Sequence, residues 1–190
     1  MDSFDKILIA IGVVVVIVVV YLVATYNRLV NLRALIENAW SNIDTELKRR
    51  YDLIPNLVAT VKGYASHEQA VLEKVISARQ QAMVTHTDRQ RQARDENQLA
   101  RALRGVIAIA ESYPQLKASE QFLALQNELR NTEDRIQAAR RFYNGNVKDS
   151  NSLVQQFPSN LLAGLFGFQT ASFFEIESAM ERQPVQVAFE

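Results

Sequence analysis

An uninterrupted apolar stretch near the N-terminus, residues 7–24, limits the possible folds of this chain more than any other feature. It contains no charged residue and no proline. An α-helix of about 18 residues is roughly 27 Å long, close to the hydrocarbon thickness of a bilayer. Its many valines disfavour a helix in water, but a backbone in lipid must satisfy its own hydrogen bonds and therefore becomes helical. The stretch predicts one transmembrane helix, marked along its length by Ile7, Gly12, Val16, Val20 and Ala24.

A cleaved signal peptide and a buried core helix are the two alternative interpretations of this stretch. A signal peptide needs a basic start, a shorter apolar core and small residues at the cleavage site. This chain starts MDSFDK, its apolar run is long, and residues 23–25 form a poor cleavage site. A core helix of this length is rarely apolar on every side. Length and flanking residues therefore favour a membrane anchor, with Tyr21 and Tyr26 near the headgroups.

Composition and motifs argue against several classes of function. The chain has no cysteine, which excludes disulfides and thiolate metal sites, and its net charge of +0 argues against a nucleic-acid partner. No phosphate-binding loop, dinucleotide fingerprint or nucleophile elbow occurs. His67 starts a sequence similar to a zinc-protease helix, but Val71 stands where the second histidine is needed. We expect no catalytic residue, metal, cofactor or small-molecule substrate.

Helical periodicity continues through the rest of the chain. Apolar residues at spacings of three and four predict helices at residues 27–83, 98–112 and 119–157, then a short C-terminal helix capped by Ser159. Pro55 predicts a kink or break at residues 51–54, and Ser119 is a candidate N-cap. Residues 85–98 lack an apolar face and suit a loop, an exposed helix end or a solvent-bridging helix. The predicted fold class is all-α: a transmembrane helix that continues into an elongated antiparallel up-and-down bundle.

The longest regular seam runs over residues 122–157, in steps of three and four across about five heptads. This pattern is typical of a helix packed lengthwise against others, and polar seam residues such as Thr132 and Asn146 can fix its register. The seam fits either a monomeric bundle or a homo-oligomer, because a thin bundle gains from burying more surface. The expected domains are residues 1–26 (anchor), 27–175 (bundle) and 176–190 (acidic flexible tail).

Four long segments, taken in order, resemble the LemA family. They are DTELKRRYDLIPNLVATVKGYASHE (residues 44–68), IAIAESYPQLKASEQFLALQNEL (107–129), TEDRIQAARRFYNGNVKDSN (132–151) and FPSNLLAGLFGF (from residue 157). The resemblance spans nearly the whole chain. It implies a membrane-anchored antiparallel helical bundle found in bacteria, without a catalytic assignment. The family's relatedness to magnetosome membrane proteins implies a part in organising membranes.

Basic residues on either side of the anchor predict its orientation. Lys6 precedes the anchor and is offset by two aspartates, whereas Arg28 and Arg33 follow it. Positive residues remain on the cytoplasmic side. We expect a single-pass protein of the bacterial inner (cytoplasmic) membrane, with its N-terminus outside and its C-terminal domain in the cytoplasm.

Two segments are candidates for interaction. The basic residues Lys48, Arg49 and Arg50 suit contact with anionic lipid or a partner, or else form a solvated helix face. Residues 160–168 are the most apolar part of the chain beyond the anchor, and they either cap the bundle or bind membrane or another subunit. The candidate residues in this second segment are Asn160, Leu161, Leu162, Leu165, Phe166 and Phe168.

These features suggest two functions. The first is a structural scaffold that self-associates into a homo-oligomer and shapes or tethers the bilayer. The second is a monomeric membrane-tethered module that recruits a signalling protein or protease. The second would use the polar face of residues 80–98, which carries Arg89, Arg91 and Arg94.

Overall fold

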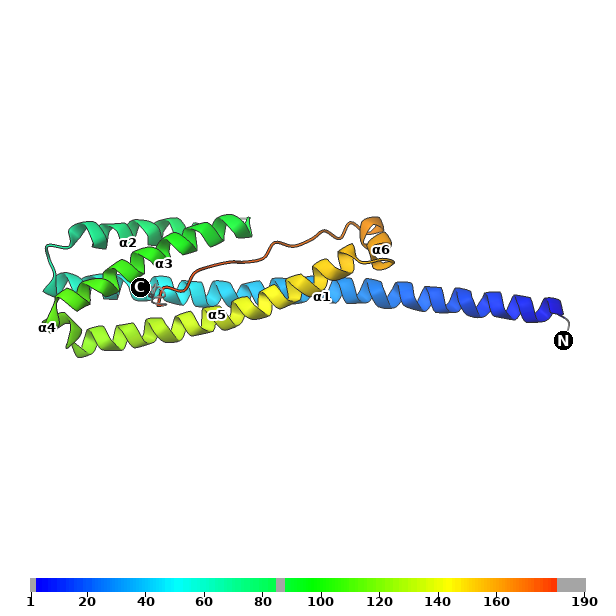
Figure 1. The fold of residues 1–190 in the computed structure, drawn as a ribbon, viewed down its shortest axis with the longest axis horizontal. Helices are drawn as coiled ribbons and strands as arrows, with labels where there is room; N and C mark the ends of the chain where they lie inside the picture. The colour runs from blue at the N-terminus through cyan, green and yellow to red at the C-terminus, as the bar shows by residue number, and fades with distance from the viewer. Residues whose placement is uncertain (1–2, 85–87, 181–190) are drawn as a thin grey trace, which may run out of the picture. The chain divides into compact units, whose positions relative to one another are not determined.

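The computed structural model describes residues 3–84 and 88–180, and every regular element in these ranges is a helix (Figure 1). The helices are α1 (Ser3–Tyr64), α2 (Gln69–Ala82), α3 (Arg89–Ser112), α4 (Pro114–Lys117), α5 (Glu120–Gln155) and α6 (Ser159–Leu165). The predicted all-α class is therefore confirmed.

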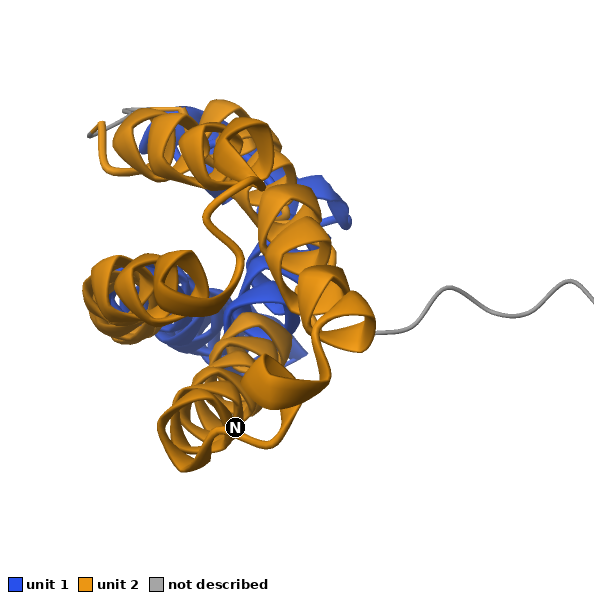
Figure 2. Ribbon diagram, turned by 90° about the vertical axis from the view of Figure 1, so that its left-hand side faces the viewer, with its two compact units in different colours: residues 1–38, 143–172 blue, residues 39–142, 173–190 orange. Residues whose placement is uncertain are grey.

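The chain divides into two compact units (Figure 2). We call the first the anchor unit, which consists of Met1–Asn38 and Tyr143–Ser172. The second is the bundle unit, which consists of Ala39–Phe142 and Phe173–Glu190. Because α1 and α5 are long, each of them contributes residues to both units.

In the bundle unit the second part of α1, α2, α3 and the first part of α5 pack around a shared apolar core. Short connections make each helix antiparallel to the next (Figure 1). The fully buried side chains include Leu47, Ile54, Leu57, Leu99, Leu103 and Phe122. The predicted cap at Ser119 is confirmed, since its hydroxyl accepts a hydrogen bond from the Phe122 backbone N–H at 3.4 Å.

The break predicted at residues 51–54 is wrong, because α1 continues through Pro55 and ends at Tyr64. A proline has no N–H to donate to the carbonyl four residues earlier, which here belongs to Tyr51. The Nε of Arg79 in α2 donates to that carbonyl oxygen at 2.7 Å. The neighbouring helix therefore satisfies the acceptor that the proline leaves unpaired, and the chain turns instead at residues 65–68.

The third helix starts earlier than predicted. It begins at Arg89, where the side chain of Asp88 caps it by accepting from the Gln90 backbone N–H at 2.8 Å. Gln92 and Glu96 are buried in the bundle unit, so the interpretation of residues 89–98 as exposed or looped is wrong. The polar side chains have buried partners, which a search for apolar periodicity does not reveal. Residues 85–87 lie outside the described residues.

In the anchor unit the first part of α1 is exposed, and packing begins only after the apolar stretch. All side chains of residues 3–24 are exposed, whereas Leu29, Leu32 and Ile36 of α1 and Val147 of α5 are buried. By length and composition, α1 contains a segment able to cross a membrane.

The segment after α5 is held by side-chain to backbone hydrogen bonds. The Asn151 amide donates to the Ala171 carbonyl at 2.9 Å and accepts from the Ala171 N–H at 2.8 Å. Gly167, with φ +69°, lets the chain reverse at the end of α6, where the Phe168 N–H bonds to the Ala163 carbonyl at 2.9 Å. Ser159 is not the cap of α6: it is the first helical residue, and its hydroxyl donates to the Gln156 carbonyl at 2.9 Å.

Residues 176–180, assigned above to the flexible tail, pack within the bundle unit. Ile176 and Ala179 are buried, and Arg104 bonds to the carbonyl of Ser178 at 2.6 Å. The sequence of these five residues did not predict this packing. Residues 181–190 lie outside the described residues. The domain boundaries themselves remain a prediction.

Candidate membrane-contact site and buried ion cluster

An aromatic cluster in the anchor unit lies at the end of the apolar stretch. The ring of Tyr26 is 4.8 Å from that of Phe166, at an interplanar angle of 58°, and 6.0 Å from that of Phe168. Tyr26 follows Ala24 by two residues, about 3 Å of helical rise. The contact therefore brings α6 and its flank beside the point where the apolar part of α1 ends.

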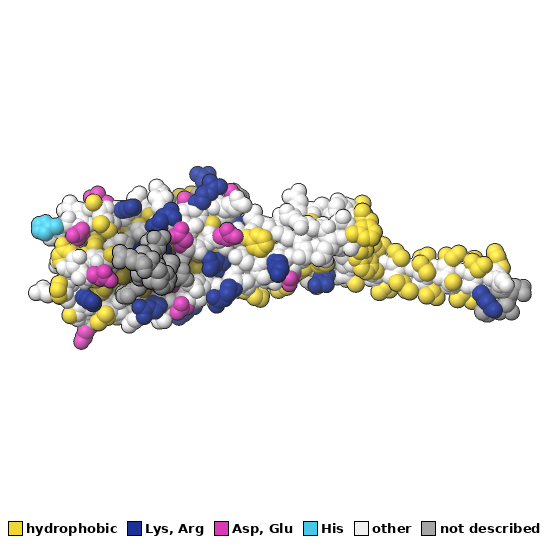
Figure 3. All heavy atoms as spheres, viewed as in Figure 1, with side chains coloured by type: hydrophobic (Ala, Val, Ile, Leu, Met, Phe, Trp, Pro, Cys, Tyr) yellow, Lys and Arg dark blue, Asp and Glu magenta, His cyan; other side chains and the backbone are white. Residues whose placement is uncertain are grey.

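The candidate segment 160–168 has one buried and one exposed side. Leu162 and Ala163 are buried, and Asn160 and Phe168 are half-buried. Leu161, Leu165 and Phe166 are exposed, as is the preceding Phe157. In Figure 3 hydrophobic side chains gather along the N-terminal part of α1 and over α6. One side of the segment is therefore packed within the anchor unit, and the other side leaves an apolar surface uncovered.

The basic candidate residues do not form one surface. Lys48 and Arg49 are exposed and pair along α1 with Asp44 at 2.7 Å and with Glu46 at 4.0 Å. Arg50 points the other way and is completely buried. The expectation of a three-residue basic surface is therefore wrong for Arg50.

Arg50 is the centre of a buried ion cluster, which we define as Arg50, Tyr51, Gln92, Glu96 and Glu133. Its Nη1 donates to Glu133 Oε1 at 2.7 Å, and its Nη2 donates to Glu96 Oε2. The second oxygen of Glu96 accepts from the Tyr51 hydroxyl and, at 2.8 Å, from Gln92 Nε2. The cluster joins α1, α3 and α5, and Gln92 extends it to the end of α2 through the Ala82 carbonyl at 3.0 Å.

The surroundings of this cluster shift the pKa values of Arg50 and Tyr51. Burial by itself lowers the pKa of Arg50, but the negative charges of Glu133 and Glu96 outweigh it and raise that pKa above its ordinary value. Burial, together with the charge of Glu96, raises the pKa of the Tyr51 hydroxyl. Arg50 therefore stays cationic and Tyr51 neutral across the physiological range.

The arrangement is suited to holding helices together. Each carboxylate is engaged by donors from its own cluster, and the side chains of Arg50 and Glu96 have no exposed surface. Within residues 3–84 and 88–180, no three acidic or histidine side chains are placed to hold a metal ion.

Tyr51, Gln92, Glu96 and Glu133 were not among the residues predicted from the sequence, although the sequence carries a signal for some of them. Arg50 stands between Leu47 and Ile54 at the spacing of the apolar face of α1. Glu96 stands three residues before Leu99 in the same register. Charged residues at core positions of two helices indicate a buried ion pair, and only the tertiary structure identifies the partners.

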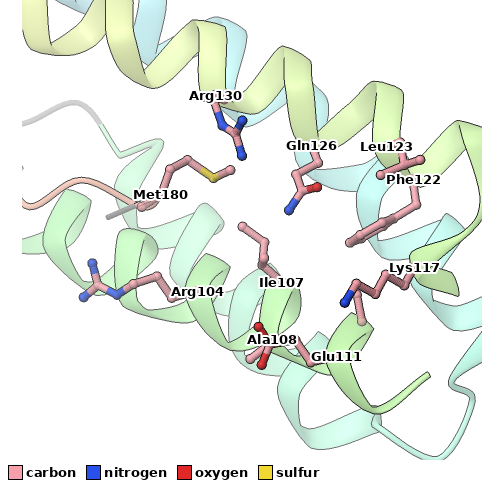
Figure 4. A pocket seen from close by; sticks show the side chains of 12 residues that line it. Arg104, Ile107, Ala108, Glu111, Lys117, Phe122, Leu123, Gln126, Arg130 and Met180 are labelled. Carbon is pink, nitrogen blue, oxygen red and sulfur yellow. The ribbon is translucent and has the colours of Figure 1, made fainter. Parts of the chain in front are cut away.

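A separate groove of about 440 Å³ lies between α3 and α5 of the bundle unit (Figure 4). Its lining combines apolar Ile107 and Phe122 with cationic Lys117 and acidic Glu111. Arg104 and Arg130 lie on either side of Met180. The Arg104 guanidinium also donates to Glu177 at 2.7 Å, and this hydrogen bond lowers the pKa of Glu177.

These features define a helical-bundle protein whose first helix is long and apolar enough to cross a membrane. The model of the LemA family matches residues 39–189, and the chain belongs to that family. It is 28% identical over 163 residues to a protein named LemA from Metamycoplasma hominis, covering 85% of this chain and 74% of that relative. It is 31% identical over 78 residues to the magnetosome proteins MamQ 1 and MamQ 2 of Paramagnetospirillum magneticum, covering 41% of this chain and 29% of each relative.

Proposed function

We propose that this LemA-family chain is a non-enzymatic, membrane-anchored structural protein whose copies associate and organise the bilayer. The observation that carries the proposal is α1 itself. One helix, Ser3–Tyr64, contains both the apolar anchor stretch and part of the buried core of the bundle unit. Such a helix ties the folded domain directly to the membrane without a flexible linker.

The buried ion cluster supports a structural role over an enzymatic one. A general acid or base must reach the substrate proton within hydrogen-bond distance. Glu96, Glu133 and Tyr51 are buried and bonded to one another or to Arg50, which suits a device that holds helices in place.

Two further points support membrane organisation by several copies. Large apolar side chains are exposed on the helices of the bundle unit, among them Ile76 of α2 and Leu123 and Phe142 of α5. Two relatives are named magnetosome proteins.

The basic residues that follow the apolar stretch favour an inner-membrane location with the bundle unit in the cytoplasm.

The test is the mass of the intact protein, extracted in detergent, by multi-angle light scattering with the detergent contribution subtracted. We expect a discrete multiple of 21.5 kDa. Phe142→Arg should lower that multiple, whereas Asn127→Arg should not, since it places the same charge at an exposed polar position of α5. A monomer for the unaltered chain would contradict self-association.

The groove favours a second candidate function, a monomeric module that recruits a membrane partner. Its lining joins apolar side chains to cationic Lys117 and Arg130 and acidic Glu111, which suits a partly apolar segment of another protein that carries charged groups. The face expected earlier, residues 80–98, suits this role less well because Gln92 and Glu96 are buried. A monomeric mass together with one foreign cross-linked product that is lost in Arg130→Glu would favour this module over the scaffold.

A further inference from the structure

We propose that an apolar patch on and beside α6, formed by Phe157, Leu161, Leu165 and Phe166, inserts into the boundary between headgroups and acyl chains of the bilayer that α1 crosses. We call these four side chains the α6 patch. The inference rests on the membrane anchorage in the proposed function, but not on self-association. It gives the anchor unit a second, surface contact with lipid beside its transmembrane helix.

The position of the patch is set by a contact inside the anchor unit. The ring of Phe166 packs at a tilt against that of Tyr26, with ring centroids 4.8 Å apart. Tyr26 lies only about 3 Å of helical rise beyond the end of the apolar stretch. When that stretch spans the hydrocarbon, Tyr26 lies at the headgroup level, where aromatic side chains are favoured. The patch is therefore held at the depth of the membrane surface.

The exposure of the patch is high for such large apolar side chains. Phe157 is 81% exposed, Leu165 is 79% exposed and Leu161 is 65% exposed. Leu161 and Leu165 are four residues apart and share one face of α6, while Leu162 and Ala163 on the other face are buried. Exposed apolar surface costs about 25 cal/mol per Å² relative to burial, so a lipid surface beside the patch stabilises it.

The charge distribution agrees with this location. No Asp, Glu, Lys, Arg or His occurs from Ser150 to Phe174, although 22% of the whole chain is charged. The region that holds the patch thus places no charge in a medium of low dielectric constant, where charges are costly. The nearest basic residues along α1, Arg28 and Arg33, follow Tyr26 and suit the headgroup region.

Lipid fits the patch better than a second copy of the chain. A stable dimer buries roughly 800 Å² on each partner, more than four side chains on and beside a seven-residue helix supply. The bilayer is already next to Tyr26, so contact with it requires no further association. A second contact beside the anchor would fix the rotation and tilt of α1, which packing and interfacial side chains otherwise determine.

The experiment uses the full chain, whose lack of cysteine allows single cysteines to be placed at will. Leu165→Cys carries an environment-sensitive fluorophore, and the protein is reconstituted in phosphatidylcholine vesicles containing lipids with a nitroxide near the top of the acyl chain. Tyr21→Cys reports on the anchor. Leu35→Cys is the matched control: it is also an exposed leucine of the anchor unit, about 14 Å beyond Tyr26 along α1.

We expect the nitroxide to quench the labels at 165 and 21 severalfold more strongly than the label at 35. Because the patch is uncharged, raising the salt concentration or adding anionic phosphatidylglycerol should leave the quenching at 165 unchanged. Adding Leu161→Ser and Phe157→Ser should weaken it, while an unchanged helical circular dichroism signal shows that these exposed substitutions preserve the fold.

The failures of the two proposals are distinguishable. Quenching at 165 no stronger than at 35, with 21 strongly quenched, would overturn the α6 contact and leave the anchor intact. A label at 21 that is not quenched would contradict the membrane anchorage itself. A label at 165 shielded from both the lipid nitroxide and a water-soluble quencher would mean that protein covers the patch, which also overturns the lipid contact.

Discussion

The bundle unit and the anchor unit share α1 and α5 but stabilise their interiors with different polar groups (Figure 2). The bundle unit buries charge, with Arg50 between Glu96 and Glu133. In the anchor unit, neutral side chains of α5 bind the segment that follows α6. The Tyr143 hydroxyl donates to the Ser172 carbonyl at 3.0 Å, and the Asn151 amide forms two bonds with Ala171.

The two kinds of polar group have different structural roles. A buried ion cluster is costly to desolvate, and each member requires its partners, so it favours one register of α1, α3 and α5 over others. Neutral amide and hydroxyl bonds hold residues 166–172 in place without introducing charge near the predicted membrane surface. Four substitutions would break or sharpen this comparison, and we give them from the largest expected effect to the smallest.

Arg50→Ala should destabilise the bundle unit by about 3–5 kcal/mol, because it leaves two buried carboxylates without their cation. The measurement is urea unfolding of the full chain in detergent, followed by circular dichroism. Lys48→Ala is the control, since its exposed pair with Asp44 should contribute only about 0.3–0.5 kcal/mol. Equal effects of the two substitutions would contradict a central role for the buried charge.

Arg79→Ala should cost about 1–3 kcal/mol, because it leaves the Tyr51 carbonyl without a donor next to Pro55. The same substitution in a Pro55→Ala chain should cost less, since the alanine introduced there supplies the missing backbone N–H. The free energies of unfolding of the four proteins form a double-mutant cycle. A coupling energy of zero would show that Arg79 does not act through that carbonyl.

Asn151→Ala should cost about 1–2 kcal/mol, because two neutral hydrogen bonds to Ala171 are lost. The effect should be confined to the anchor unit. Amide hydrogen exchange should become faster in residues 166–172 and stay unchanged in α3. The control is Ser152→Ala, a half-buried neighbour whose hydroxyl donates to the Lys148 carbonyl within α5. Faster exchange throughout the bundle unit would contradict the separation of the two units.

Glu177→Gln should have the smallest effect, and the effect should depend on pH. The hydrogen bond from Arg104 lowers the pKa of Glu177 in the folded chain, so its contribution is present above the unfolded pKa and is lost as pH falls through the folded pKa. The difference in unfolding free energy between the two proteins should therefore shrink on acidification. A difference that grows at low pH would contradict this sign.

Much of the fold follows from local sequence pattern. The seam of residues 122–157 predicted α5, which ends at Gln155, and its members Phe122, Leu129 and Ile136 are buried. The start of α3 was not predicted, because Gln92 and Glu96 are polar and apolar periodicity does not reveal a helix face that buries charged side chains. The sequence left open whether segment 160–168 caps the bundle or is exposed, because the answer depends on which side of α6 packs, and its role in interaction stays a prediction.

By itself the sequence determined the helical class, the apolar stretch, the main seam and the family, since spacing along one chain encodes which residues share a helix face. Only the tertiary structure decided the partners of Arg50, which lie 46 and 83 residues away, and the donor that lets α1 continue through Pro55, which lies 28 residues from the carbonyl it serves. Such pairs join distant segments, and a buried polar group is stable only where packing brings its partner.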